Sequence, residues 1–150
     1  MATKMTFLYM RAVGLCAVAL AFWLVIGSDA RVLHQTCGAT HPSVGFTADM
    51  VEISHDLRGT FTVVDDCTFK IENFSYDGTG PAVYWWGNTD ASPSQLRYGK
   101  MVVDEKVPAG GGSGTTYTGT LTDGVTWDDI KILSAWCVAF NVDFGHVVIA

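Results

Sequence analysis

Residues 132–140 read Ile-Leu-Ser-Ala-Trp-Cys-Val-Ala-Phe, and both alternating sets of positions in this run are apolar. In an extended chain one side would carry Leu133, Ala135, Cys137 and Ala139, and the other Ile132, Trp136, Val138 and Phe140. A strand with only one buried face is apolar at every second position. The run therefore predicts a central strand, extending over residues 130–140, that is covered on both faces.

Seven further runs have the composition of short strands, being rich in β-branched and aromatic residues. They cover residues 50–54, 59–64, 68–74, 82–86, 101–104, 117–121 and 146–149. Turn signals such as Asp77-Gly78 and Asp123-Gly124 separate them, and a glycine-rich stretch over residues 106–116 indicates a flexible loop. No helix of useful length is expected. The pattern predicts an all-β domain, either an antiparallel β-sandwich or a jelly-roll-like barrel.

The first thirty residues have the order of a signal peptide. Lys4 and Arg11 come before an uninterrupted apolar stretch over residues 12–26, and Ser28 and Ala30 suit the small positions of a cleavage site. The stretch is shorter than the roughly 20 residues that a membrane-spanning helix needs. The alternative is an uncleaved membrane anchor. We expect cleavage after Ala30 and secretion to the extracellular space, with no other attachment to a membrane.

Cleavage would leave a polar N-terminal arm over residues 31–50 and one β domain over residues 51–150. Of the 9 basic and 15 acidic residues in the chain, the first thirty residues contain Lys4, Arg11 and Asp29, so the remainder has a formal charge of −7. Binding to a phosphate backbone requires clustered Lys and Arg. The charge therefore argues against nucleic acid as a partner.

The cysteine count raises a chemical question. Cys16 leaves with the signal peptide, so Cys37, Cys67 and Cys137 enter an oxidising compartment. Three cysteines form at most one intramolecular disulfide, and each of the three pairings is open from the sequence. One thiol therefore has to be free, capped or joined to another molecule.

Standard catalytic signatures are absent from the sequence, including G-x-S-x-G, H-E-x-x-H, C-x-x-C and a phosphate-binding glycine loop. This absence argues against hydrolases and zinc enzymes. The four histidines show no ligand spacing, so no metal site is predicted; they are His34, His41, His55 and His146. Paired acids at residues 65–66, 104–105 and 128–129 sit at strand ends, where acids commonly cap turns and protect sheet edges.

An aromatic cluster suggests a binding function. Tyr84, Trp85 and Trp86 are consecutive, so alternation allows either Trp85 or the pair Tyr84 and Trp86 to face outward. Exposed aromatic rings beside polar groups can stack on a sugar ring or another flat ligand. Packing of most of these rings in the core is the competing interpretation.

Two stretches carry a family resemblance. One runs from H-D-L-R-G at residues 55–59, through D-D-C-T-F at residues 65–69, to D-G-T-G-P-A-V-Y-W-W-G at residues 77–87. The other is A-W-C-V-A-F-N-V-D-F-G-H-V at residues 135–147. Together they resemble the electron-transfer DM-13 domain, a β-sandwich-like extracellular module often found beside DOMON domains and cytochrome b-type membrane modules. The resemblance covers about Ser54 to Ala150, although no DOMON or cytochrome segment accompanies it and the glycine-rich loop before Thr115 is long.

The resemblance implies an electron-transfer module rather than a substrate-converting enzyme. The family's proposed functional cysteine corresponds to Cys137, next to Trp136, acting as a redox thiol or as the ligand of a haem-like cofactor. The residues alone leave another interpretation open, in which Cys137 is a buried inert thiol. The protein would then be a non-catalytic extracellular module that binds a carbohydrate or a protein.

The resemblance also bears on the disulfide. It reaches Cys137 without requiring Cys37, and the arm has little else to hold it, so we favour a bond between Cys37 and Cys67. A bond between Cys67 and Cys137, stapling two sheets together, is the alternative. A separate motif, Asn73-Phe74-Ser75, satisfies the N-glycosylation sequon near the end of a predicted strand.

Overall fold

The computed structural model describes residues 37–149. The predicted signal peptide and the beginning of the predicted arm lie outside the described residues. Within residues 37–149, no helix has the length and apolar character needed to cross a membrane.

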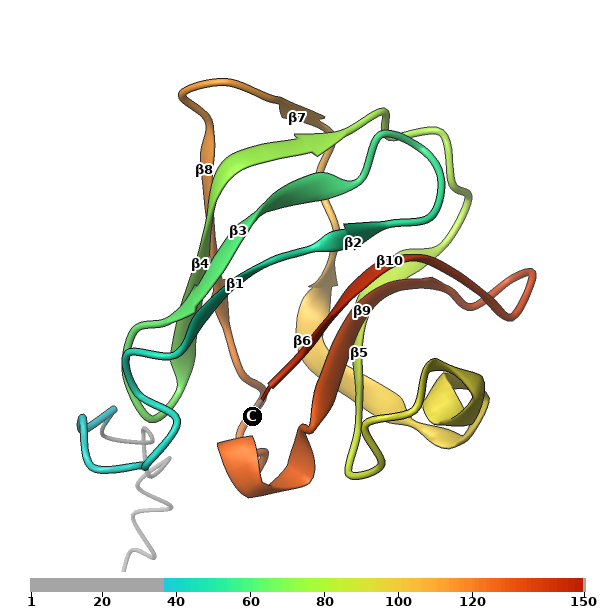
Figure 1. Ribbon diagram of the computed structural model, residues 1–150. Helices are drawn as coiled ribbons and strands as arrows, with labels where there is room; N and C mark the ends of the chain where they lie inside the picture. Colours follow the sequence, from blue (N-terminus) through green and yellow to red (C-terminus); the bar gives the residue numbers. More distant parts are fainter. Residues whose placement is uncertain (1–36, 150) are drawn as a thin grey trace, which may run out of the picture. The chain divides into compact units, whose positions relative to one another are not determined.

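The described residues form two antiparallel sheets of five strands each (Figure 1). In the first sheet the order is β1 (Thr47–Asp49), β3 (Arg58–Val63), β4 (Thr68–Tyr76) and β7 (Gly110–Gly111), with β8 (Thr116–Thr120) also paired to β4. In the second the order is β2 (Val51–Glu52), β10 (Val142–Val148), β9 (Ile132–Cys137), β5 (Val83–Asn88) and β6 (Lys100–Lys106). The predicted all-β class is confirmed, and its form is a β-sandwich.

The core lies between the two sheets and is rich in aromatic side chains. Phe61, Phe69 and Phe74 enter it from the first sheet, while Trp85 and Phe144 enter it from the second. Alternation along the strands gives each sheet one apolar face. In β4 an irregularity between Glu72 and Ser75 lets Phe74 face the core together with Phe69.

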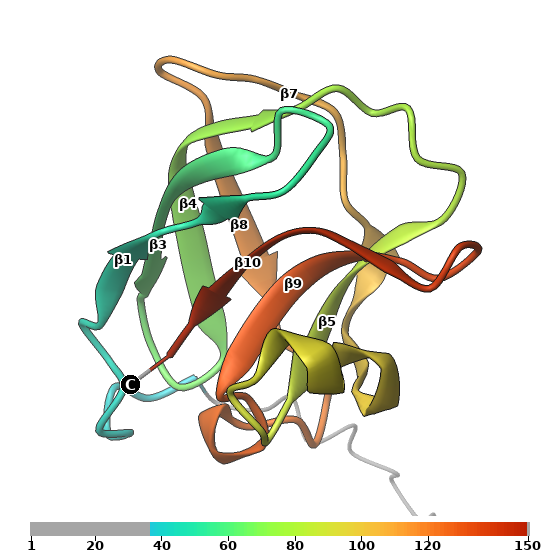
Figure 2. The same ribbon diagram turned by 45° about the vertical axis from the view of Figure 1, so that its right-hand side comes forward.

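The chain passes from one sheet to the other near its start. β1 pairs with β3 in the first sheet, and β2, after Met50 alone, pairs with β10 in the second. The strand predicted at residues 50–54 is confirmed only at Val51 and Glu52, which form β2. β1 precedes it and lies within the residues predicted to form the N-terminal arm. Figure 2 shows β1 and β2 following one another across the open side of the sandwich.

The central strand is confirmed, but its predicted length is wrong. All six residues of β9 are buried, between β10 on one side and β5 on the other. The strand ends at Cys137, because the chain then turns into β10 through Asn141 in the left-handed conformation, with a φ of 56°. Val138 and Phe140 lie on this turn and are 45% and 68% exposed. β10 accordingly begins four residues before the predicted strand at residues 146–149.

Two short 3-10 helices complete the fold, η1 (Pro93–Tyr98) and η2 (Trp127–Asp129). Leu96 of η1 packs with Ile132, Trp136 and Trp86 on the face of the second sheet that points away from the core. This small cluster covers the outer side of β9 and explains why both alternating sets of its residues are apolar.

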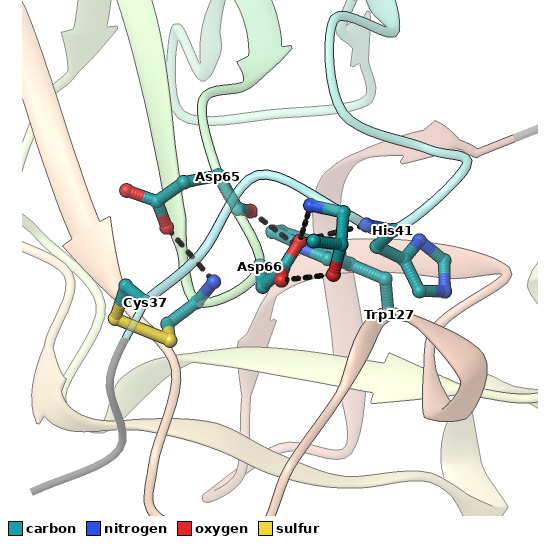
Figure 3. The surroundings of a disulfide bond; sticks show 7 residues. Cys37, His41, Asp65, Asp66 and Trp127 are labelled. Atoms are coloured by element: carbon teal, nitrogen blue, oxygen red, sulfur yellow. Dashed lines mark hydrogen bonds between the residues drawn. A yellow bond between two sulfur atoms is a disulfide. The ribbon is translucent and has the colours of Figure 1, made fainter.

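The arm is held by a disulfide bond between Cys37 and Cys67, which confirms the favoured pairing (Figure 3). The two Cα atoms are 5.3 Å apart. Beside the bond, Asp66 accepts hydrogen bonds from the backbone N–H groups of Thr40 and His41, each at 2.8 Å. These bonds, the His41 N–H above all, hold the pKa of Asp66 below its ordinary value.

Candidate functional site

Cys137 is the free cysteine among the described residues, and it is fully buried. It occupies the last position of β9, opposite Val83 of β5 and Val142 of β10. Its side chain belongs to the main core, together with Leu133 and Ala135 of the same strand. A fully buried thiol reacts only when a reagent can reach it, which requires the surroundings to open.

Two loops meet at this end of the sandwich, and we call them together the cap. The first loop, residues 53–57, joins β2 to β3, and the second, residues 77–82, joins β4 to β5. Asp77 N donates to the carbonyl oxygen of His55 at 3.0 Å, which ties the loops to each other. At the other end of the second loop, Val138 N donates to Ala82 O at 2.9 Å, immediately after Cys137. The cap therefore closes over the end of β9.

His55 is the side chain that joins both loops to the core. Its Nδ1 lies 3.0 Å from Asp77 Oδ2 and 2.9 Å from Thr79 Oγ1. The Thr79 hydroxyl donates its single hydrogen to Asp77 Oδ1 at 2.8 Å, so His55 Nδ1 must carry the proton and act as donor. The His55 ring also lies on the Phe144 ring, with centroids 4.0 Å apart.

The first loop holds His55 in this position through its own backbone. His55 and Asp56 both have left-handed φ values, 62° and 56°, which turn the chain sharply before β3. The Asp56 carboxylate pairs with Arg58 and accepts a hydrogen bond from the buried Ser75 hydroxyl of β4. Asp56 therefore anchors the turn from which His55 projects.

The second loop packs tightly on the core above Cys137. Gly80 N donates to the Tyr76 hydroxyl at 3.0 Å. A Cβ atom at Gly80 would lie 2.6 Å from Tyr76 Oη and 2.7 Å from Phe144, and closer still to Val83, which pairs with Cys137. Burial raises the pKa of Tyr76 above its ordinary value, and the neighbouring Asp77 and Cys137 act in the same direction. The phenol beside Cys137 is thus a neutral group.

The second acid of the cap is strongly hydrogen-bonded. The Thr79 N–H, at 2.9 Å from Asp77 Oδ1, is the main cause that lowers the pKa of Asp77. The Thr79 hydroxyl and His55 lower it further. Asp77 is therefore ionised at neutral pH and remains a good acceptor for His55.

Trp136 and Cys137 lie on opposite faces of the second sheet. Cys137 belongs to the main core, whereas Trp136 packs with Leu96 and Ile132 in the outer cluster. Neighbouring residues of a strand point to opposite sides, so the two side chains cannot line one pocket.

The aromatic cluster of β5 divides in the way that alternation requires. Trp85 is fully buried in the core. Tyr84 and Trp86 face outward and are half-buried. Trp86 Nε1 donates to the Leu96 carbonyl oxygen at 2.9 Å, so this ring fastens η1 to the sheet rather than standing free.

A trio of Ser134, Asp143 and His146 on the second sheet was not anticipated from the sequence. Ser134 Oγ donates to Asp143 Oδ1 at 2.7 Å, and His146 Nδ1 lies 2.6 Å from Asp143 Oδ2. Serine and histidine thus both bond to the carboxylate, whereas a hydrolytic triad requires the serine to bond to the histidine. The trio therefore ties β9 to β10 without the geometry of a nucleophile.

Asn73 lies at an irregularity in β4, with a left-handed φ of 54°. Its side chain is exposed, and its Oδ1 accepts a hydrogen bond from Gly114 N at 3.0 Å. The sequon's serine, Ser75, is buried and bonds to Asp56. In the folded protein the asparagine is therefore accessible while the serine is not.

The surroundings of Cys137 do not fit a haem. The thiol is fully buried in a packed core, and the loop above it has no room for a methyl group at Gly80. Trp136, the other residue considered for a cofactor, lies on the opposite face. The chemistry that this arrangement supports is that of a shielded thiol.

Sequence reasoning assigned a role to Cys137 but none to His55, Asp77 and Thr79, whose side chains join the two loops of the cap. All three lie in the H-D-L-R-G and D-G-T-G-P segments that were quoted for the family resemblance. Their presence in those segments was the available signal, and the structure explains it by bringing the two segments together over the end of β9.

Comparisons with known proteins agree with this reading of the motifs. The family model described as Electron transfer DM13 matches residues 49–149. An Arabidopsis thaliana relative, described as a cytochrome b561, DM13 and DOMON domain-containing protein, is 28% identical over 116 residues, which cover 77% of this chain and 13% of the relative.

Two isoform groups of the Drosophila melanogaster protein Skeletor are also similar. Isoforms B/C and D/E are each 35% identical over 107 residues, covering 67% of this chain and 13% and 7% of the relatives. The chain therefore spans only a small part of the length of these relatives. No solved structure gives a significant match.

Proposed function

Because this chain belongs to the electron transfer DM13 family, we propose that it is a redox module whose redox group is the Cys137 thiol, with no bound cofactor. One observation carries the proposal: the cysteine that the disulfide leaves free lies at the end of the central strand, under a cap of hydrogen-bonded loops. The Arabidopsis relative's name, which places DM13 beside cytochrome b561 and DOMON, supports a role in redox chemistry.

The proposed chemistry is a reversible two-electron oxidation of sulfur. Cys137 loses its proton to water, and the thiolate sulfur attacks one oxygen of a peroxide. The S–O bond forms, the O–O bond breaks, and hydroxide leaves, so the sulfur gives two electrons to the peroxide. A small thiol then displaces the oxygen as water and forms a mixed disulfide, and a second small thiol releases Cys137 in its reduced form.

We also propose that the protein acts outside the cell. Its support is the order of charged, apolar and small residues over positions 4–30, which is that of a signal peptide. The Cys37–Cys67 disulfide adds support, since such bonds persist in oxidising compartments. N-terminal sequencing of protein from culture medium is expected to begin at Arg31, and an intact Met1 in the membrane fraction would contradict it.

The redox proposal is tested on the purified protein with hydrogen peroxide as the oxidant. We expect mass spectrometry to find one added oxygen, at Cys137, that reacts with a sulfenic-acid trap and disappears after treatment with dithiothreitol. The Cys137→Ala variant is the control and should gain no reducible oxygen, while its disulfide stays intact.

Two results would overturn the proposal. One is a Cys137 that remains a thiol under peroxide until the protein is unfolded. The other is a native protein that is purified with the absorption spectrum of haem and loses it in the Cys137→Ala variant, since the cofactor rather than the thiol would then carry the electrons.

A further inference from the structure

Residues 78–81 of the second cap loop make no backbone-to-backbone hydrogen bonds within the described part of the chain. On either side of Cys137, β5 and β10 are bound to β9 through strand ladders. Residues 78–81 have no such ladder, and their contacts are made largely to side chains, such as Gly80 N to Tyr76 Oη at 3.0 Å. Segments with few backbone hydrogen bonds open locally at a lower free-energy cost than strands do.

His55 makes the contacts that hold this loop down from outside. Its Nδ1 reaches Asp77 and Thr79 at 3.0 and 2.9 Å, and its ring rests on Phe144, whose side chain is part of the core under the loop. The same residue's carbonyl oxygen accepts Asp77 N. His55 is thus connected to the loop and to the layer beneath it.

We propose that His55 and Asp77 are positioning residues that control access to the Cys137 thiol by latching the second cap loop closed. The inference rests on the proposed function, because control of access matters only if the thiol reacts. The latch keeps the sulfur buried at rest, and a local opening of residues 77–82 admits a small oxidant or thiol without unfolding the sandwich.

The test measures how fast Cys137 reacts with an aromatic disulfide reagent in the native protein. When the loop recloses faster than the reagent attacks, the observed rate is proportional to the population of the open form. Loss of a hydrogen bond to a charged group shifts such an equilibrium substantially, so we expect His55→Gly to raise the rate about fivefold to tenfold. Glycine suits this position because it accepts the left-handed conformation of His55 without strain.

Two further variants separate the latch from a general loss of stability. His55→Asn tolerates the same backbone conformation and keeps a hydrogen-bond donor, so it should restore most of the protection. His41→Gly is the matched control, because His41 also pairs with an acid, at 3.3 Å from Asp128, but lies beside the disulfide. It should leave the Cys137 rate within about twofold of the wild type.

Global stability is measured on every variant by urea unfolding. The latch is overturned if Cys137 reacts at the same rate in His55→Gly as in His41→Gly. It is also overturned if the increase in the reaction rate is fully accounted for by a lower free energy of global unfolding. The redox proposal fails separately from the latch. If the reaction rate of Cys137 depends on His55 but peroxide never oxidises Cys137, the latch stands and the redox function is refuted. If peroxide oxidises Cys137 but the rate does not depend on His55, the redox function stands and the latch is refuted.

Discussion

The two ends of the sandwich hold their loops in different ways. At one end, the arm is fixed by the Cys37–Cys67 disulfide and by the hydrogen bonds to Asp66 (Figure 3). At the other end, the second cap loop is held by His55, Asp77 and Thr79 through hydrogen bonds alone. The disulfide fixes the first end covalently. At the second end, the free thiol of Cys137 lies under a loop that can open.

This difference separates stability from reactivity in one small domain. A covalent link raises the free energy of global unfolding, since it restricts the unfolded chain. A hydrogen-bonded loop can open while the rest of the sandwich remains folded. Changes at the disulfide end should therefore alter global unfolding, and changes at the cap end should alter the access of reagents to Cys137.

The largest expected effect comes from removing the disulfide. The bonded cysteines are 30 residues apart in sequence, and we expect Cys37→Ala with Cys67→Ala to reduce the free energy of unfolding by about 3–4 kcal/mol. Urea unfolding measures the loss. The reaction rate of Cys137 in the absence of urea should stay below that of His55→Gly, and a larger increase would show that the two ends are coupled.

Gly80→Ala should have the next largest effect, and its effect should be concentrated at the cap. The added methyl group would overlap Tyr76, Phe144 and Val83, and overpacking of this kind costs about 1–3 kcal/mol. We expect faster reaction of Cys137 and a lower urea midpoint. Gly111→Ala is the control, because its Cβ would meet only Thr115, at an ordinary 3.5 Å; equal effects in both variants would contradict tight packing at Gly80.

Acid should weaken both ends, and the responsible carboxylates can be separated. The pKa values of Asp66 and Asp77 lie below the ordinary value of 3.8, chiefly because the N–H groups of His41 and Thr79 donate to them. Lowered values stabilise the fold above the ordinary pKa, and the contribution is lost as the pH falls through the lower, folded values. Stability should therefore decline below a pH of about 3.8.

Two alanine variants assign this decline to the two ends. Asp66→Ala should reduce the acid dependence of global unfolding in urea, since it removes a group whose pKa changes on folding. Asp77→Ala should reduce it too, because the pKa of Asp77 is also lowered on folding. Only Asp77→Ala should change the acid dependence of hydrogen exchange at the Thr79 amide, and the same change in Asp66→Ala would show that the carboxylates do not act locally.

The smallest effect is expected at Asn73, outside both ends. A secretory eukaryotic host should attach a glycan there before folding, while Ser75 is still accessible. The exposed position predicts a change in stability within about 0.5 kcal/mol. A mobility shift on treatment with a glycan-removing amidase, absent in Asn73→Gln, checks it, and an unshifted wild-type protein would contradict it.

The fold class could be predicted because alternation reports burial directly. The end of β9 could not, since Val138 and Phe140 are apolar but lie on an exposed turn, where periodicity carries no information. Asn141, with its left-handed conformation, was the only local sign of that turn. Similarly, the division of residues 47–52 between two sheets depends on pairing with β3 and β10, which lie far away in the sequence.

The site was predictable in part. The three cysteines that follow the predicted signal peptide pointed to a free thiol. Alternation already placed Trp136 and Cys137 in opposite sets, which the grouping of both as cofactor residues overlooked. The latch was out of reach, since His55 and Asp77 are 22 positions apart and meet only because β3 and β4 are antiparallel neighbours.

The length of β4 has one more consequence. The strand runs from Thr68, next to Cys67, to Tyr76 beside Cys137, and nine residues of extended chain span about 30 Å. A sulfur atom attacks a disulfide only at bonding distance. The folded sandwich therefore keeps the Cys137 thiol away from the existing bond, so that a free thiol and a disulfide persist in one domain with the pairing unchanged.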